Sequence, residues 1–140
     1  MLLAQNAKIV SSNVPVDINN AAVTGDYVCL KDYNHLTVIL HFGAVGTGTA
    51  VTMKQATDVT NSASDEKALA INYMWANVGL TTDTLTKTAV TSNTFTVSSD
   101  PSNLYVMEFD AAELVTLAAR LTSDQKREAL KRAIAFKPEE

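Results

Sequence analysis

The residues best suited to nucleophilic or metal chemistry in this chain are its one cysteine, Cys29, and its two histidines, His35 and His41. A cysteine beside a histidine can form an activated thiolate, and imidazole is a common metal ligand. On a single strand His35 and His41 would share a face but lie roughly 20 Å apart, because a strand rises roughly 3.3 Å per residue. One metal ion cannot bind both. We therefore interpret all three as structural or surface residues.

Two loop-like segments carry residue types that bind ions or phosphate in other proteins. Asp58, Asp65 and Glu66 are potential calcium ligands, but they lack the alternating acidic pattern of an EF-hand, so we expect a solvated loop over 58–67. The glycine-rich segment 43–48 lacks the Lys–Ser/Thr pair of a phosphate-binding loop and reads as a flexible hairpin. The sequence thus predicts no catalytic, cofactor-binding or metal-binding residue and no cofactor.

Three aromatic residues, Tyr73, Trp75 and Phe95, offer a possible stacking platform for a sugar or for single-stranded nucleic acid. Binding of nucleic acid is disfavoured because no basic residues lie near these aromatic residues in the sequence. Aromatic side chains at alternating strand positions are more often part of the core, and we prefer that interpretation. Sugar binding through Tyr73 and Trp75 stays open as an alternative.

Overall composition excludes several classes of protein. The chain has 140 residues, a formal net charge of -4 and only 19% charged residues, which disfavours nucleic-acid binding. It contains no apolar run of the roughly 18 residues that a membrane helix needs, and residues 1–6 do not resemble a secretory signal. A single cysteine cannot form an internal disulfide, so we expect packing alone to stabilise the fold and synthesis in a reducing compartment.

Composition also divides the chain near residue 111. Residues 1–111 contain 15 threonines, and their five lysines and ten acidic residues give a net charge of -5. Residues 112–140 contain two threonines and all three arginines, and their six basic and five acidic residues give +1. We expect a β body over 1–111 and a helical tail over 112–140, within one domain unit.

The body shows about eight short strands separated by turn signals, a spacing typical of a β-sandwich, jelly roll or barrel. Threonine supports this interpretation because its branched Cβ suits a pleated surface. The segment 35–42 is so continuously apolar that we expect both of its faces to be covered. The expected strands are 7–10 and 14–18 (one or two strands at an edge), 27–30, 35–42, 50–56, 71–75, 85–90, 93–97 and 104–109.

The tail shows helical periodicity. Four apolar residues, Leu114, Leu117, Ala118 and Leu121, follow the spacing of one helix face. Thr122 and Gln125 fit a capping box at the start of a second helix. We therefore predict helices over 111–121 and 123–136. Helices this short are marginal alone, so they must dock on the sheet, a sister subunit or a partner.

Three stretches resemble the capsid cement (decoration) proteins of tailed phages, including that of a Bordetella phage: HLTVILHFG at 35–43, AVTMKQA at 50–56 and NLYVMEFDAAEL at 103–114. The resemblance covers roughly residues 1–114 and includes no catalytic motif. It implies a jelly-roll-like β domain on the outside of an icosahedral shell, self-association as dimers, and binding across neighbouring major capsid subunits. The helical pattern after Leu114 departs from the relatives, where strand-like sequence continues.

The expected function is therefore that of a structural virion protein, not an enzyme. It would be made in the bacterial cytoplasm, bind the outer surface of the phage capsid and stabilise contacts between major capsid subunits. The alternatives are another phage head, tail or fibre component, or a carbohydrate-binding β-sandwich. An enzyme would require Cys29 and the two histidines to meet in one cleft.

Overall fold

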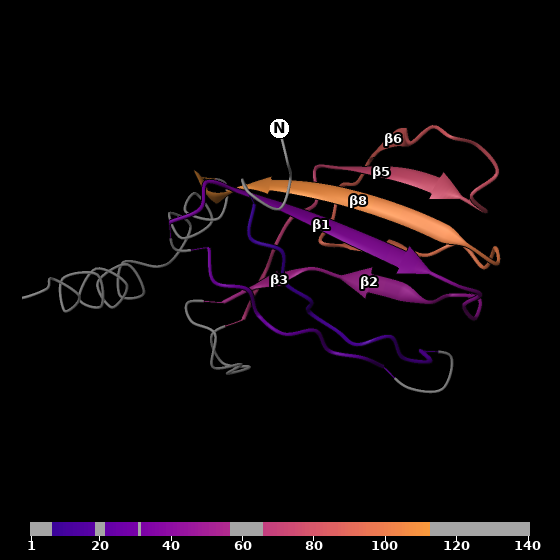
Figure 1. Ribbon diagram of the computed structural model, residues 1–140, viewed down its shortest axis with the longest axis horizontal. Helices are drawn as coiled ribbons and strands as arrows, with labels where there is room; N and C mark the ends of the chain where they lie inside the picture. The colour runs from indigo at the N-terminus through magenta and orange to yellow at the C-terminus, as the bar shows by residue number, and fades with distance from the viewer. Residues whose placement is uncertain (1–6, 19–21, 31, 57–65, 113–140) are drawn as a thin grey trace, which may run out of the picture.

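The computed structural model describes residues 7–18, 22–30, 32–56 and 66–112, which form a mainly β structure (Figure 1). Within these ranges every strand pairing is antiparallel. No helix in the described part is long and apolar enough to cross a membrane. The described residues form eight strands, β1 (His35–Phe42), β2 (Ala50–Thr52), β3 (Lys54–Gln55), β4 (Lys67–Ala68), β5 (Tyr73–Val78), β6 (Thr86–Ala89), β7 (Thr94–Thr96) and β8 (Asn103–Asp110).

Four strands form the main sheet, in the order β1-β8-β5-β6. β8 is central and pairs with β1 along its whole length, from His35 opposite Asp110 to Phe42 opposite Asn103. β5 pairs with the other side of β8 and with β6. The main sheet therefore joins strands from distant parts of the sequence through β8.

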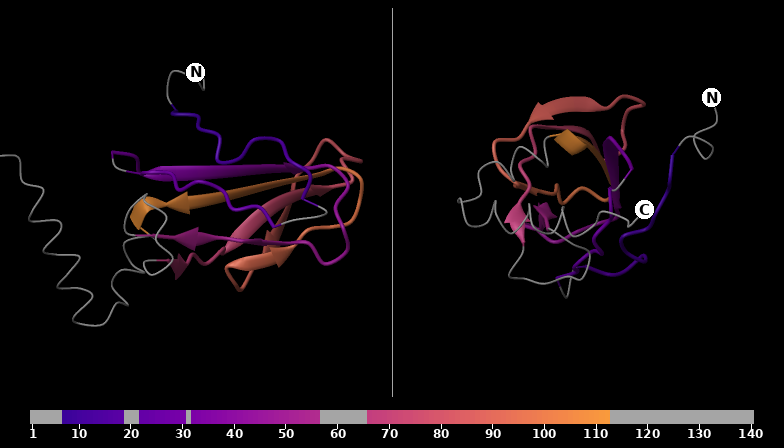
Figure 2. Two further views of the ribbon diagram at one scale, coloured as in Figure 1. Left: turned by 90° about the horizontal axis from the view of Figure 1, so that it is seen from below. Right: turned by 90° about the vertical axis from the view of Figure 1, so that its left-hand side faces the viewer.

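Two smaller sheets, β2 with β7 and β3 with β4, lie on one side of the main sheet (Figures 1 and 2). The core fills the space between them. Its buried members are Val45, Leu69, Ile71, Phe95, Val97, Tyr105, Met107 and Phe109. The ring of Tyr105 contacts Phe95, with centroids 5.1 Å apart, and Phe42, with centroids 6.1 Å apart, so one β8 side chain links both layers.

β8 has an inner face toward this core and an outer face away from it. Asn103, Tyr105, Met107 and Phe109 alternate with less buried residues, because successive strand side chains point to opposite faces. The inner face ends at Asn103, which is 0% exposed. Its amide nitrogen donates to the carbonyls of Ser98 (3.0 Å) and Asp100 (2.9 Å), and its side-chain oxygen accepts from the Gly79 amide (3.2 Å). Asn103 thus ties together the turns before β8 and after β5.

The prediction of strands over 7–10, 14–18 and 27–30 is wrong, because the described residues 7–18 and 22–30 contain no strand. This N-terminal segment instead doubles back on itself along the body (Figure 1), with the Asp26 amide donating to the Ser12 carbonyl (3.1 Å). Short apolar runs form strands only where another strand offers a ladder, and no described strand does so here. The helices expected over 111–121 and 123–136 lie, apart from residues 111 and 112, outside the described residues.

The positions of the strands were predicted better than which of their faces would be buried. Segment 35–42 forms β1 as expected, but burial alternates along it and Ile39 is 65% exposed, so only one face is covered. In the predicted strand 71–75, Ile71 would share a face with Tyr73 and Trp75, yet it is 1% exposed while Tyr73 is 48% exposed. β5 begins only at Tyr73, so strand alternation does not extend back to Ile71. Segment 50–56 is divided between β2 and β3, and Lys67 of the expected loop belongs to β4.

Candidate functional site

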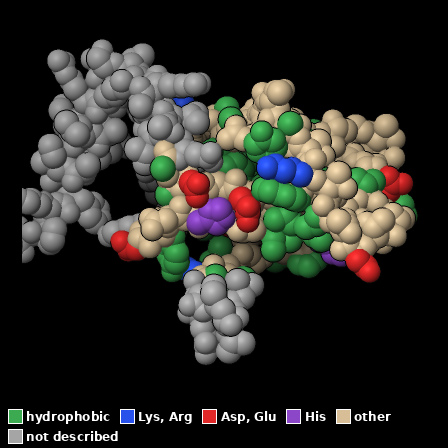
Figure 3. All heavy atoms as spheres, turned by 90° about the horizontal axis from the view of Figure 1, so that it is seen from above, with side chains coloured by type: hydrophobic (Ala, Val, Ile, Leu, Met, Phe, Trp, Pro, Cys, Tyr) green, Lys and Arg blue, Asp and Glu red, His purple; other side chains and the backbone are tan. Residues whose placement is uncertain are grey.

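The outer face of the main sheet carries a charged cluster where β1 meets β8. His35 Nδ1 lies 3.0 Å from Asp110 Oδ1, and His35 Nε2 lies 3.8 Å from Glu108 Oε1. Glu108 and Asp110 are two positions apart on β8 and therefore project from the same face. On the face seen in Figure 3, a histidine lies between two acidic side chains.

These contacts make His35 more basic than an ordinary histidine. The hydrogen bond to Asp110 raises the pKa of His35 above 6.5. Desolvation opposes this rise, and the negative charge of Glu108 adds a smaller increase. His41 lies at the opposite end of β1, where it pairs with Leu104. The two histidines share the exposed face of β1, as predicted, and lie toward its opposite ends.

Beside the charged cluster, β5 presents two aromatic side chains. Tyr73 and Trp75 pair with Ala89 and Lys87 of β6. The Lys87 ammonium lies over both rings, 4.0 Å from the Tyr73 centroid and 5.3 Å from the Trp75 centroid, which is the geometry of a cation–π contact. Phe95 lies in the core instead. Of the three aromatics proposed as a platform, the structure therefore brings together Tyr73 and Trp75, and preferring the core is wrong for the half-exposed Tyr73.

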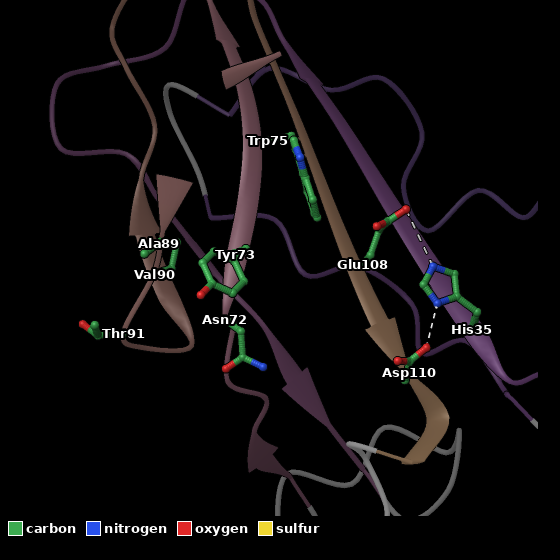
Figure 4. Close-up of a pocket in the computed structure, with 9 residues that line it drawn as sticks. All are labelled: His35, Asn72, Tyr73, Trp75, Ala89, Val90, Thr91, Glu108 and Asp110. Atoms are coloured by element: carbon green, nitrogen blue, oxygen red, sulfur yellow. Dashed lines mark hydrogen bonds and ion pairs between the residues drawn. The ribbon is translucent and has the colours of Figure 1, made fainter. Parts of the chain in front are cut away.

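The charged cluster and the aromatic pair border one hollow of about 660 Å³. In Figure 4 the histidine and carboxylates form one wall, and Asn72, Tyr73 and the segment 89–91 form the facing wall, with Trp75 between them at one end. The hollow therefore combines aromatic, acidic, amide and hydroxyl groups on one side of the sheet. Its lining is His35, Asn72, Tyr73, Trp75, Ala89, Val90, Thr91, Glu108 and Asp110. We call it the outer hollow.

A second charged cluster centres on Glu66, one of the residues considered for calcium. Its carboxylate accepts hydrogen bonds from the Tyr27 hydroxyl (2.5 Å) and from the Lys54 ammonium. The bond from Lys54, and then that from Tyr27, lowers the pKa of Glu66, while the bond to Glu66 raises the pKa of Tyr27 to about 12. Glu66 therefore holds the N-terminal segment against β3. Asp58 and Asp65 lie outside the described residues.

The remaining candidates do not converge. Cys29 is exposed on the N-terminal segment, and no hydrogen bond or ion pair joins it to either histidine. Segment 43–48 connects β1 and β2, as expected of a loop, with Gly48 in the left-handed region at φ 85°. Within the described ranges, no group of three His, Cys, Asp or Glu residues is placed to hold a metal ion.

Sequence reasoning missed both the partners of His35 and the position of Lys87. The predicted strand 104–109 ended before Asp110, and the meeting of Glu108 and Asp110 with His35 depends on the long-range pairing of β1 with β8. Lys87 likewise reaches the aromatic pair only through the register of β5 and β6.

Comparisons of the chain with models of known protein families, with curated proteins and with solved structures find no match.

Proposed function

We propose that this chain is a structural virion protein, a cement (decoration) protein that binds the outside of a phage capsid and stabilises contacts between major capsid subunits. The observation that carries the proposal is the exposed apolar surface of the N-terminal segment. Val14 is 77% exposed and Ile9 71% exposed, and Val16, Val23 and Val28 are exposed as well. Apolar side chains gathered on one segment are typical of surfaces that a protein partner covers.

The N-terminal segment suits docking for a second reason. Its described residues contain no strand, so its backbone can adapt to a partner surface, while Glu66 fixes its second half through Tyr27. Low overall charge, 19% of residues, fits a protein that buries much of its surface against neighbours. Repetition around a shell would convert weak individual contacts into tight attachment.

Self-association, the second part of the proposal, is supported by the edges of the main sheet. β1 is eight residues long and pairs with β8 on one side only, as far as the described residues extend. Its inner side chains Leu36, Val38, Leu40 and Phe42 are only partly buried. A long edge strand with such side chains is a template for pairing with a strand of another subunit. The jelly-roll-like topology and the helical tail over 112–140 belong to the same proposal.

Co-sedimentation of the full chain with empty shells of the major capsid protein tests attachment. We expect saturable binding by the wild type, and binding at least ten-fold weaker for a V14D/V16D variant, because a carboxylate cannot be buried cheaply in an apolar contact. T86D/T88D, which places the same two charges on exposed β6, is the matched control and should bind like the wild type. A wild type that stays in the supernatant, or a V14D/V16D variant that binds normally, contradicts the proposal.

Deletion of residues 115–140 tests the tail. We expect the shortened chain to keep its β circular dichroism while attachment or self-association weakens. Undiminished, saturable attachment by a shortened chain that still forms oligomers in analytical ultracentrifugation would contradict a docking role for the tail.

A further inference from the structure

The outer hollow is separate from the N-terminal segment, so its use does not depend on capsid attachment. Its volume of about 660 Å³ lies within the 300–1,000 Å³ typical of pockets for small ligands. The hollow also has two chemically different parts. Tyr73 and Trp75 supply aromatic surface, and Glu108 and Asp110 supply carboxylates across the hollow from Tyr73 (Figure 4).

This division matches the two kinds of surface on a pyranose sugar. Such a ring has a face of C–H groups, which packs on aromatic rings, and a rim of hydroxyls, which need hydrogen-bond acceptors and donors. Carboxylates accept only, and hydrogen bonds from a hydroxyl to a charged oxygen are stronger than those between neutral groups. Asn72 adds an amide that can both donate and accept.

The charges around the hollow select among sugars. Two carboxylates face it, and one of them, Asp110, already holds His35. Lys87 contacts both aromatic rings and is not one of the residues that line the hollow. An acidic sugar or a phosphate would meet the carboxylates with like charge, whereas a neutral sugar meets no such cost.

Tyr73 and Trp75 are also held ready for such packing. They are next-but-one neighbours on β5, with Lys87 over both, so their orientation is fixed before a ligand arrives. Fixed aromatic side chains lose little conformational freedom on binding. An exposed tyrosine such as Tyr33, outside the hollow, has no comparable setting in the described structure.

We propose that the outer hollow is a binding site for a neutral oligosaccharide, in which Tyr73 and Trp75 pack on a pyranose ring while Glu108 and Asp110 accept hydrogen bonds from its hydroxyls. The site involves binding only, and no bond is made or broken. The basic alternative occupant, an arginine- or lysine-containing peptide attracted by the same carboxylates, is distinguished by experiment.

Trp75 is the only tryptophan of the chain, so its fluorescence reports directly on the hollow. The full-length protein is titrated with maltotriose, cellotriose, mannotriose and chitotriose, with trigalacturonate, and with a triarginine peptide, and the wild type is applied to a glycan array. We expect a saturable change with at least one neutral trisaccharide, and none with trigalacturonate or triarginine.

Variants then locate the binding. Y73A and E108Q each leave Trp75 in place, and each should weaken the neutral sugar at least ten-fold, while Y33A and D83N, matched changes outside the hollow, should leave the affinity within two-fold. Circular dichroism confirms that each variant is folded. No saturable response to any neutral sugar on the array or in solution overturns the proposal, as does binding of triarginine or trigalacturonate alone, or sugar binding that Y73A and E108Q leave unchanged.

Discussion

The two faces of β8 differ sharply although their residues alternate along one strand. The inner face carries Tyr105, Met107 and Phe109, all buried in the core, whereas the outer face carries Leu104, Val106, Glu108 and Asp110, all at least partly accessible. The inner face is fully committed to packing with the small sheets. The outer face keeps both apolar and charged groups within reach of solvent, and it borders the outer hollow. Stability and recognition therefore occupy opposite faces of the same strand.

Among variants that test this comparison, F109A should have the largest effect. Phe109 is 2% exposed, so its truncation leaves a cavity, and we expect a loss of about 3–5 kcal/mol in the free energy of unfolding. The neighbouring change E108A removes a half-exposed side chain from the opposite face, and it should cost less than about 1 kcal/mol. Urea denaturation followed by circular dichroism measures both. Equal losses for the two variants would contradict the division between the faces.

The next largest effect should come from N103A. The variant leaves the Gly79 amide and two carbonyls without their buried partner, so we expect a loss of about 1–3 kcal/mol. Hydrogen exchange of the Gly79 amide should accelerate more than that of amides in β2. A variant with unchanged stability would show that the turns before β8 and after β5 are held by other contacts.

A smaller, pH-dependent effect should come from His35 on the outer face. Its pKa is raised in the folded protein, so its contribution to stability is present below about pH 6.5, the ordinary histidine value, and is lost as pH rises through the raised folded value. Because the pair is half exposed, we expect only about 0.2–1 kcal/mol. NMR titration of the His35 imidazole should give a pKa above the ordinary histidine value of about 6.5.

H35Q is the matched variant for this effect. It should flatten the dependence of the unfolding free energy on pH between about 6 and 8. If the wild type and H35Q respond identically to pH in this range, the contacts of His35 with Glu108 and Asp110 do not contribute in solution.

The smallest effect should be that of I39T. Ile39 lies on the exposed outer face of β1, so the free energy of unfolding should change by no more than about 0.5 kcal/mol. V38T, one position away on the inner face, places a hydroxyl against the core and should cost about 1–3 kcal/mol. Chemical denaturation of the two variants compares the faces of β1 directly, and a larger loss for I39T would reverse the assignment.

The sequence predicted strands well where local pattern and long-range pairing agree. Segments 35–42 and 104–109 formed β1 and β8 because both are long, apolar and rich in β-branched or aromatic residues. The apolar runs at 7–10, 14–18 and 27–30 did not form strands, since propensity alone supplies no pairing partner. The local pattern also could not show whether the Tyr73 side chain would be buried or exposed, because that depends on the sheet beside it.

The candidate site was even less accessible to sequence reasoning. Tyr73 and Trp75 were singled out by their alternation, and the structure brings them together under Lys87. His35, Glu108 and Asp110 were not connected, because they meet only through a ladder that spans the chain. Lys87 had no signal of its own, since a single lysine on a threonine-rich strand is an ordinary surface residue. Register between distant strands is the missing information in both cases.

The central position of β8 also has a kinetic consequence. It is the last strand within the described residues, and its Asp110 pairs with His35, 75 positions earlier. During synthesis β1 and β5 therefore lack their shared pairing partner until β8 has been made. The main sheet cannot form gradually from the N-terminus. Such non-local closure slows folding and leaves apolar strands open to association with other chains. We expect a nascent chain that stops before Asn103 to depend on chaperones, whereas one that extends past Asp110 can close its sheet.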